Sequence, residues 1–434
     1  MQDNLKKKIL TRKANVGIIG LGYVGLPLAV TFAKSDFKVY GIDIDKNRVR
    51  RLKMGESYIL DVPASDVVET IKNGMLNVTA DFSVIKKLDA VIICVPTPLY
   101  KTKEPDVSYI VSAVDNIKKF MKRGQIVVLE STTYPGTTEE VMLPILESTG
   151  LKEGKDFYLA FSPERIDPGN KNYDTKNTPK IIGGISPKST ELAKILYEQV
   201  IDRIIPVSSS KVAEMVKLLE NTFRIVNIGL VNELMLMCDR IGIDVWEVID
   251  AAKTKPYGFM PFYPGPGVGG HCIPVDPIYL SWKARMHGFE ARFIDLSSYV
   301  NSQMPYYVVD KVIQGLNEKR KSLKGSKVLV MGVAYKKDVK DLRESPALEI
   351  IDILVKKGAL VSYYDPLLPY LKIHDINLKS VKFEKGSFAN SDCVVVVTDH
   401  SDIDYDFVRK NSGLIIDTRN IYKDASDRKN IIKL

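Results

Sequence analysis

The residue of this sequence best placed for covalent chemistry is a cysteine in a glycine-rich loop. Cys272 follows two glycines and His271, and Asp276 comes four residues after it. The surrounding residues 259–277 contain too much Gly and Pro for a helix or a strand, and loops of this kind often line sites. Such a loop can expose a thiolate as a nucleophile. We expect inert packing roles for the cysteines on apolar stretches, which are Cys94, Cys238 and Cys393.

A second pattern predicts a site for a dinucleotide. Residues 20–25 read Gly-Leu-Gly-Tyr-Val-Gly, between an expected strand and an expected helix. In G-x-G-x-x-G the first Gly permits a tight turn, the second lets the backbone approach a pyrophosphate, and the third permits close helix packing. Asp43, at the end of the next strand, supplies a carboxylate for the ribose. Its charge would repel a 2′-phosphate, so the pattern favours NAD over NADP. An ordinary glycine-rich turn beside a capping Asp is the alternative.

Three further residues could support this chemistry. Lys217 and Asn221 are spaced i, i+4 and therefore share one face of a predicted helix, which by spacing alone is more typical of a solvated face than of a site. Glu164 directly follows a predicted strand, at the carboxyl edge where doubly wound sheets bind ligands.

The elements that must position these residues form two α/β regions. In the first, apolar runs predict strands at 15–20, 37–45, 90–98, 125–132 and 156–164, with a helix at 22–35. In the second, which lacks the glycine pattern, they predict strands at 327–332, 361–366, 393–398 and 414–418, with Ser345 and Pro346 starting a helix. Alternating strands and helices predict a parallel sheet covered on both faces.

Between these regions lies a long helical pattern that begins near Ser208 and stops at Gly242. A helix of this length outspans a small domain, so we expect it to act as a spine between domains and as a dimer contact. The predicted architecture is α/β, with two Rossmann-like doubly wound parallel-sheet domains joined by the long helix. The expected domains are an NAD-binding domain (1–207), a central domain with the cysteine loop (208–322) and a third domain (323–434).

Composition narrows the class of protein. The 434 residues are 45% hydrophobic and 26% charged, which excludes a disordered chain. The net charge of +9 is spread thinly, with Lys6–Lys8 as its densest run, so we expect no nucleic-acid partner. Residues 6–33 have the outline of a signal peptide, but the glycine pattern inside them argues against one. We expect no membrane span, no metal and, from four widely spaced cysteines, a reduced cytoplasmic setting.

Six motifs in order give the chain a family resemblance. They are GLGYVG, EST, SPE, K-x-x-x-N, GGHC-x-x-x-D and KKD-x-x-x-L-R-E-S, and they extend over nearly the whole sequence. In this set the chain resembles the UDP-sugar dehydrogenases, which belong to the UDP-glucose/GDP-mannose dehydrogenase family. The resemblance implies oxidation of the C6 alcohol of a UDP-linked hexose to a carboxylate, with two hydride transfers to NAD.

The resemblance also implies roles for individual residues. Cys272 would form a thiohemiacetal and then a thioester, and Asp276 with an ordered water would take the alcohol proton. Lys217 and Asn221 would stabilise the oxyanion. Glu164 is implied in hydrolysis of the thioester, and Thr132 in positioning the water.

Binding residues follow in the same way, with the third region as the UDP-binding domain and the site between the two α/β regions. The implied cofactor-binding residues are Gly20, Gly22, Tyr23, Val24, Gly25, Asp43, Thr97, Ser131, Thr132 and Arg343. The implied substrate-binding residues are Glu164, Arg165, Lys217, Asn221, Tyr263, Gly267, Gly269 and Lys336. The expected assembly is a homodimer through the central helix or a higher oligomer. Lys255 is the candidate for the Arg that UDP-glucose enzymes receive from a neighbouring subunit.

Departures from the UDP-glucose enzymes point to a branch of the family. Residues 162–169 read SPERIDPG rather than SPEFL-x-E-G, and residues 130–136 contain a Thr-Tyr insertion. The loop at 259–280 resembles the branch that acts on UDP-N-acetylhexosamines for surface polysaccharide or glycan precursors, with UDP-N-acetylglucosamine as the preferred prediction. UDP-N-acetylmannosamine and UDP-glucose remain alternatives. A two-electron NAD alcohol dehydrogenase without covalent catalysis and a catalytically silent NAD-binding regulator are the alternatives of other classes.

Overall fold

The computed structural model describes residues 2–59, 61–100, 102–166, 172–270 and 272–434. The chain forms two compact units, each of which is described by itself. The first unit contains Met1–Glu220 and Trp282–Phe289, and the second contains Asn221–Ser281 and Glu290–Leu434. His271 and residues 167–169, which the sequence motifs include, lie outside the described residues.

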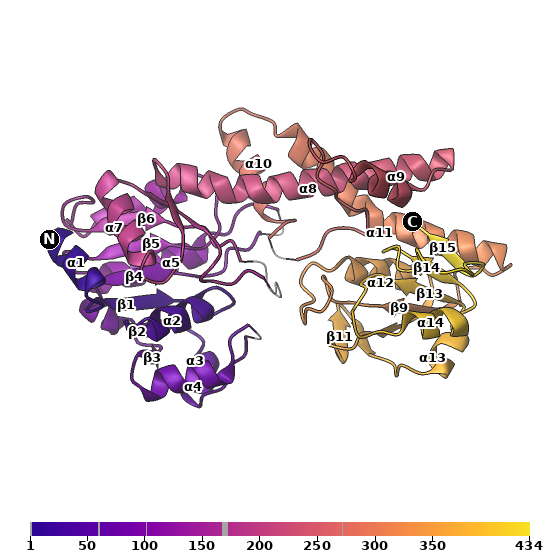
Figure 1. The fold of residues 1–434 in the computed structure, drawn as a ribbon, viewed down its shortest axis with the longest axis horizontal. Coiled ribbons are helices and arrows are strands. Elements are labelled where there is room, and N and C mark those ends of the chain that lie inside the picture. Colours follow the sequence, from indigo (N-terminus) through magenta and orange to yellow (C-terminus); the bar gives the residue numbers. More distant parts are fainter. Residues whose placement is uncertain (1, 60, 101, 167–171, 271) are drawn as a thin grey trace. The chain divides into compact units, whose positions relative to one another are not determined.

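The first unit is built on an eight-stranded sheet (Figure 1). Its strands are, in spatial order, β3 (Leu76–Thr79), β2 (Lys38–Ile42), β1 (Asn15–Ile19), β4 (Ala90–Ile93), β5 (Ile126–Leu129), β6 (Tyr158–Phe161), β7 (Lys180–Gly184) and β8 (Ile204–Pro206). Neighbouring strands are parallel except β6 and β7, which are antiparallel. The strand order reverses between β1 and β4, and open α/β sheets bind ligands at such a reversal.

Helices cover both faces of this sheet because alternate side chains of its apolar strands point to opposite faces. On one face, residues such as Val16 and Ile18 pack with α1 (Gln2–Leu10), α2 (Gly25–Lys34), α3 (Lys46–Lys53), α4 (Ala64–Lys72) and α7 (Pro187–Tyr197). On the other, residues such as Val91 and Ile93 pack with η1 (Phe82–Lys87), α5 (Ser108–Phe120), η2 (Thr138–Met142) and α6 (Leu143–Glu147). The predicted strands at 15–20, 37–45, 90–98, 125–132 and 156–164 correspond to β1, β2, β4, β5 and β6.

The long helix α8 spans Ser210–Ile241, as the periodicity predicts. The Ser209 hydroxyl accepts a hydrogen bond from the Val212 N–H at 3.3 Å near its start, and Gly242 ends it with a φ of 75°. A glycine adopts this left-handed conformation without strain, so it commonly follows a helix.

The second unit contains a five-stranded parallel sheet. Its strands, in spatial order, are β10 (Leu360–Tyr364), β9 (Lys327–Met331), β13 (Cys393–Val396), β14 (Ile415–Asp417) and β15 (Ile431–Lys433). One face packs against α9 (Val245–Ala252), α11 (Arg292–Glu318) and α12 (Pro346–Lys356), and the other against α13 (Lys385–Ala389) and α14 (Tyr405–Asn411). A two-stranded hairpin, β11 (Tyr370–Ile373) and β12 (Ile376–Lys379), and helix α10 (Asp276–Met286) complete the described elements.

These observations confirm the predicted fold class, with two Rossmann-like sheets and a long connecting helix. Ser345 caps α12 by accepting from the Ala347 N–H at 3.3 Å, with Pro346 in the first turn as predicted. Sequence reasoning missed β3, β7, β8, β15 and the β11–β12 hairpin, whose strands have only three to five residues. The three-domain boundaries stay a prediction. Among the described residues, no helix is both long and apolar enough to cross a membrane.

Candidate active site

The turn between β1 and α2 has the geometry that the three glycines predict. Gly20 has a φ of 92°, and a Cβ there would lie 2.5 Å from the carbonyl oxygen of Cys94. At Gly25, the first residue of α2, a Cβ would lie 1.8 Å from the carbonyl oxygen of Gly20. A Cβ at Gly22 would meet no other described atom within 4 Å. Gly20 and Gly25 are therefore required by packing, whereas Gly22 leaves open space beside the start of a helix.

Asp43 closes this turn from the end of β2. The side chain is buried, and its carboxylate accepts hydrogen bonds from the Leu21 N–H at 2.9 Å and the Asp45 N–H at 2.8 Å. Arg48 lies 3.5 Å from the same carboxylate. Open space at Gly22, a helix N-terminus and a carboxylate fixed at the adjacent strand end are what a dinucleotide requires, so these residues fit NAD.

The remaining cofactor residues predicted in this unit follow β4 and β5 at the same carboxyl edge. Thr97 lies beyond β4 and is half-buried. The Ser131 hydroxyl, just beyond β5, donates to the carbonyl oxygen of Val95 at 2.7 Å and thereby joins the two loops. Thr132 is half-buried, and Tyr23 and Val24 belong to the glycine turn itself. The parallel strands therefore bring these residues to one edge of the sheet.

Glu164 lies beyond β6 at this edge. One carboxylate oxygen accepts hydrogen bonds from the backbone N–H groups of Arg165 and Ile166, both at 2.7 Å, and the other lies 3.5 Å from the Lys180 ammonium. Burial disfavours the carboxylate, but the Lys180 charge, these N–H donors and the Lys217 charge hold its pKa below the ordinary value. Glu164 is therefore an ionised group, suited to accept a proton.

Arg165 joins this loop to α8. Its guanidinium forms an ion pair with Glu220, with a shortest separation of 2.6 Å, and donates to the carbonyl oxygen of Pro179 at 2.6 Å. Lys217, one turn earlier on α8, is buried in the same unit. The structure gives Arg165 a protein partner on the helix of Lys217, while its predicted contact with substrate stays untested.

In the second unit, Cys272 and Asp276 lie on one helical turn at the start of α10. The Asp276 N–H donates to the Cys272 carbonyl oxygen at 2.8 Å, and Asp276 is the first residue of α10. Asp276 is buried, and its carboxylate accepts a hydrogen bond from the side-chain amide of Asn221. Cys272 is partly exposed, whereas the other three cysteines are buried, as packing roles require, and the role of Cys272 as nucleophile stays a prediction.

The loop that precedes Cys272 is held by contacts within the second unit. The Tyr263 ring stacks on Trp246 at a centroid distance of 5.5 Å, and its hydroxyl donates to Asp250 at 2.8 Å. A Cβ at Gly269 would lie 2.8 Å from the Tyr335 Cβ, and one at Gly267 would lie 3.3 Å from Pro346. These three residues have packing contacts within the second unit, and their predicted contact with substrate stays a prediction.

The segment after β9 forms a turn like the one between β1 and α2, but a different side chain contacts its carboxylate. Gly332 has a φ of 76°, and the Asp365 carboxylate accepts from the Val333 and Ala334 N–H groups at 2.8 and 3.1 Å, as Asp43 does in the first unit. Here, however, the same carboxylate also contacts the buried His400 ring at 3.2 Å. The first glycine and the strand-end carboxylate are thus common to both turns, and in the second unit the carboxylate is also occupied by a buried histidine.

His400 also positions the turn that carries Lys336. Its Nδ1 accepts a hydrogen bond from the Asp338 N–H at 3.0 Å, and Asp338 itself adopts a left-handed φ of 60°. Lys336 is half-buried on this turn. Arg343, the predicted cofactor contact of this unit, is exposed and pairs with both oxygens of Asp341, with a shortest distance of 2.6 Å.

Comparison with known proteins adds a family match in three consecutive segments. Residues 14–201, 211–303 and 329–424 match the NAD binding, central and UDP binding domains of the UDP-glucose/GDP-mannose dehydrogenase family. This chain belongs to that family. As a member of the UDP-glucose/GDP-mannose dehydrogenase family, it is an NAD-dependent UDP-sugar dehydrogenase, which confirms the predicted family, enzyme class and cofactor.

Relatives of this UDP-sugar dehydrogenase carry the names of two substrates. It is 38% identical to a UDP-N-acetyl-D-mannosamine dehydrogenase of Methanococcus vannielii over 97% of this chain and 95% of the relative. It is 40% identical to a UDP-N-acetyl-D-glucosamine 6-dehydrogenase of Pseudomonas aeruginosa over 81% and 82%. Among solved structures, a UDP-D-ManNAc dehydrogenase from Pyrococcus horikoshii superposes with a TM-score of 0.88 at 35% identity, over 96% of this chain and 98% of the other.

Two features of this dehydrogenase escaped sequence reasoning. Lys180 contacts Glu164 from β7, a strand that was not predicted. Arg419, beyond β14, donates to the Val397 carbonyl oxygen at 2.8 Å, and its Nη1 lies 2.8 Å from where a Cβ on Gly265 would be. The signal for Arg419 was its place directly after a predicted strand, at the carboxyl edge of the second sheet.

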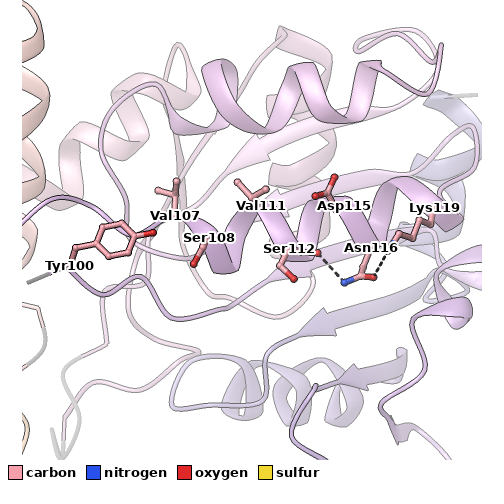
Figure 2. Close-up of a pocket in the computed structure, with 8 residues that line it drawn as sticks. All are labelled: Tyr100, Val107, Ser108, Val111, Ser112, Asp115, Asn116 and Lys119. Carbon is pink, nitrogen blue, oxygen red and sulfur yellow. Dashed lines mark hydrogen bonds between the residues drawn. The ribbon is translucent and has the colours of Figure 1, made fainter.

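A pocket of about 510 Å³ lies along α5 (Figure 2). Its lining is mostly one polar face of that helix, where the Asn116 amide donates to the Ser112 carbonyl oxygen and Lys119 to Asn116. It contains none of the predicted site residues, so we place the active-site candidates at the sheet edge and not in this hollow.

Proposed function

We propose that this enzyme oxidises C6 of a UDP-N-acetylhexosamine to the carboxylate, with two molecules of NAD reduced per sugar. The observation that carries the proposal is the turn that places the partly exposed Cys272 one helical turn before Asp276, with Asn221 donating to Asp276. A nucleophile is what separates a four-electron oxidation from an alcohol dehydrogenase that stops at the aldehyde.

An N-acetylhexosamine is the substrate feature shared by the names of the Methanococcus vannielii and Pseudomonas aeruginosa relatives. UDP-N-acetylglucosamine is the sequence-based prediction, whereas relatives that match over more than nine tenths of this chain are named for UDP-N-acetylmannosamine. The two sugars differ only in configuration at C2, and we keep both within the proposal.

The first step oxidises the alcohol to an aldehyde. Asp276 accepts the proton of the C6 hydroxyl through a water, while a hydride leaves C6. NAD, when bound, supplies the acceptor for this hydride and for the second one. Asn221 holds the Asp276 carboxylate in one orientation throughout.

The second step traps the aldehyde. The Cys272 thiolate adds to C6 and forms a C–S bond, and the oxyanion is stabilised by Lys217 and Asn221 and then protonated. The N-terminal end of α10 lies next to the sulfur-bearing residue and stabilises an anion there. Loss of a second hydride and the hydroxyl proton converts this thiohemiacetal to a thioester.

The third step hydrolyses the thioester. Glu164 accepts a proton from a water held by Thr132, the water oxygen forms the new C–O bond, and the C–S bond breaks to release Cys272. The sum is one alcohol, two NAD⁺ and one water giving one carboxylate, two NADH and three protons.

We also propose that the enzyme works in the cytoplasm and supplies precursors of surface polysaccharides. We propose further that it acts as a homodimer and that its chain consists of three domains, 1–207, 208–322 and 323–434. A staphylococcal relative, Protein CapL, is 36% identical over 96% of this chain. The UDP binding domain match supports a UDP-sugar as the bound substrate.

The test is to count NADH. With limiting UDP-N-acetylglucosamine, UDP-N-acetylmannosamine or UDP-glucose and excess NAD, we expect two NADH per sugar nucleotide and the highest kcat/KM for an N-acetylhexosamine. One NADH per sugar would replace the proposal with a two-electron dehydrogenase, and a preference for UDP-glucose would overturn the substrate class. Cys272→Ser is the control variant, expected to bind NAD normally and to lose multiple turnover.

A further inference from the structure

A row of buried polar groups lies behind Glu164 in the first unit. The Lys180 ammonium is 3.1 Å from the Glu130 carboxylate and 3.5 Å from the Glu164 carboxylate. The second oxygen of Glu130 accepts a hydrogen bond from the Tyr197 hydroxyl. The side chains of Lys180 and Glu130 are 6% and 0% exposed, so solvent does not screen these charges.

The antiparallel strand explains how Lys180 comes to this place. Glu130 follows β5 and Glu164 follows β6, and both strands end at the carboxyl edge of the sheet. Because β7 runs antiparallel to β6, its first residue, Lys180, begins at that same edge. A parallel strand would have placed its last residue there instead.

The charges of this row are unequal in number. Two carboxylates share one ammonium, and buried carboxylates are stable as ions only when paired. The pKa of Glu130 is raised by its burial, and the pKa of Glu164 is held low by Lys180 despite its own burial. When Glu164 takes a proton, Lys180 and Glu130 still balance each other.

We propose that Lys180 is a positioning residue that keeps Glu164 ionised for the hydrolysis of the thioester, and that Glu130 limits this effect so that Glu164 remains a competent base. This inference rests on the proposed function, because it assigns a purpose to the protonation state of Glu164. Tyr197 orients Glu130 in turn.

The other charged or titratable groups around Glu164 include Lys217, Arg165 and Cys94. Lys217 on α8 adds a second positive charge, and Arg165 is paired with Glu220. Cys94 on the loop after β4 is buried, and burial raises the pKa of its thiol, so it adds no charge. Lys180 is thus the cation whose removal changes Glu164 without changing α8.

The test uses two substitutions with opposite expected effects. In Lys180→Met, Glu164 loses its neighbouring cation, and the acidic limb of the kcat–pH profile should move to higher pH by about one unit or more. In Glu130→Gln, Lys180 no longer shares its charge with the Glu130 carboxylate. Lys180 then stabilises the ionised Glu164 more strongly, so the same limb should move to lower pH. Lys180→Arg should restore the wild-type limb, and KM for NAD should stay within about twofold.

A spectroscopic reading separates this inference from the proposed function. The carboxyl stretch of Glu164, identified by its loss in Glu164→Gln, can be titrated by difference infrared spectroscopy without substrate. The double variant E130Q/K180M removes the Lys180–Glu130 ion pair as a unit, so Glu130 is not left as a buried unpaired charge, and this variant serves if Lys180→Met alone fails to fold.

In Lys180→Met we expect the Glu164 stretch to report protonation at a higher pH than in the wild type, and in the double variant at a higher pH than in Glu130→Gln. Unmoved titration in Lys180→Met relative to the wild type, or in the double variant relative to Glu130→Gln, would overturn the inference. It would do so even if the wild type forms two NADH, in which case the proposed function stands. A wild type without sugar-dependent NADH would overturn the function, while the infrared titration would still decide whether Lys180 controls Glu164.

Discussion

At the scale of single residues, Asp43 builds the glycine turn and is the residue predicted to bind the cofactor ribose. We expect Asp43→Ala to weaken NAD binding about tenfold or more, because two backbone N–H groups, those of Leu21 and Asp45, lose their acceptor. Arg48, 3.5 Å away, would then be available to a 2′-phosphate, so discrimination against NADP should relax. Titration of both cofactors by calorimetry measures the ratio of the two dissociation constants.

The control for this prediction is another carboxylate beside the same arginine. Asp45 lies 3.6 Å from Arg48 but caps α3 and makes no contact with the glycine turn through its side chain among the described contacts. Asp45→Ala should therefore keep the preference for NAD. An Asp43→Ala enzyme with the wild-type ratio of the two constants would contradict the role of Asp43.

Residues also show where sequence reasoning reaches its limit. The glycines of residues 20–25 and Asp43 were predicted correctly in place, because their spacing encodes a local turn. At Gly267 and Gly269 the sequence does not distinguish a close approach by a ligand from one by a neighbouring side chain. In the structure, Pro346 lies close to Gly267 and Tyr335 lies close to Gly269. Lys180 could not be found because its partners are 50 and 16 residues away and meet it only through the antiparallel strand.

At the scale of elements, Glu214 fastens α8 to the loop that follows β5. Its carboxylate accepts hydrogen bonds from the Gly136 N–H at 2.6 Å, the Thr138 N–H at 2.9 Å and the Thr138 hydroxyl at 2.7 Å. This loop also carries Ser131 and Thr132 at its start, and α8 carries Lys217 one turn further on. The contact therefore joins the cofactor loop to the helix with the predicted oxyanion donor.

This contact predicts a pH-dependent stability. Burial raises the pKa of Glu214 from 4.5 to about 7, although its three hydrogen-bond donors oppose this rise. A carboxyl group whose pKa is higher in the folded than in the unfolded protein contributes stability that is full below pH 4.5 and is lost as the pH rises through about 7. The loss is at most about 3 kcal/mol, because a pKa difference of one between the folded and unfolded protein corresponds to about 1.36 kcal/mol.

Glu214→Gln cannot ionise, so its stability should not fall over this window in the same way. Urea denaturation of both proteins at pH 5 and pH 8 gives the difference, and we expect the wild type to lose about 1–3 kcal/mol more than the variant between the two values. Parallel curves for the two proteins would mean that Glu214 does not change its ionisation there.

At the scale of the whole molecule, periodic patterns predicted the architecture well. The 32-residue α8 and most strands of both large sheets follow from apolar runs, Ser caps and Gly stops. The short strands β8 and β15 were missed because they are only partly buried, whereas the equally short β14 is fully buried and lies in an apolar run. Such patterns do not predict the assembly, because an apolar stripe on a helix has the same sequence pattern whether it packs in the core of its own chain or against another subunit.

For the part of α8 that belongs to the second unit, the structure shows which apolar residues are buried within the chain and which are exposed. Leu230, Leu234, Met237 and Ile241 repeat at helical spacing, and they are 51%, 36%, 50% and 59% exposed. Their neighbours Val231, Met235 and Cys238 are buried in the core of the second unit. The helix thus has an apolar face beyond the one its own chain covers, and such faces mark interaction sites.

We therefore predict a homodimer through this stripe, with the same surface contributed by both subunits. Met237→Lys would bury an unpaired charge at the contact and should weaken association by roughly 100-fold, about 3 kcal/mol. Asp375→Asn, in the exposed turn between β11 and β12, changes the net charge by the same amount and should leave association unchanged. Sedimentation equilibrium of the three proteins measures this directly. A monomeric wild type, or a Met237→Lys protein that dimerises as tightly as the wild type, would show that α8 serves some other contact.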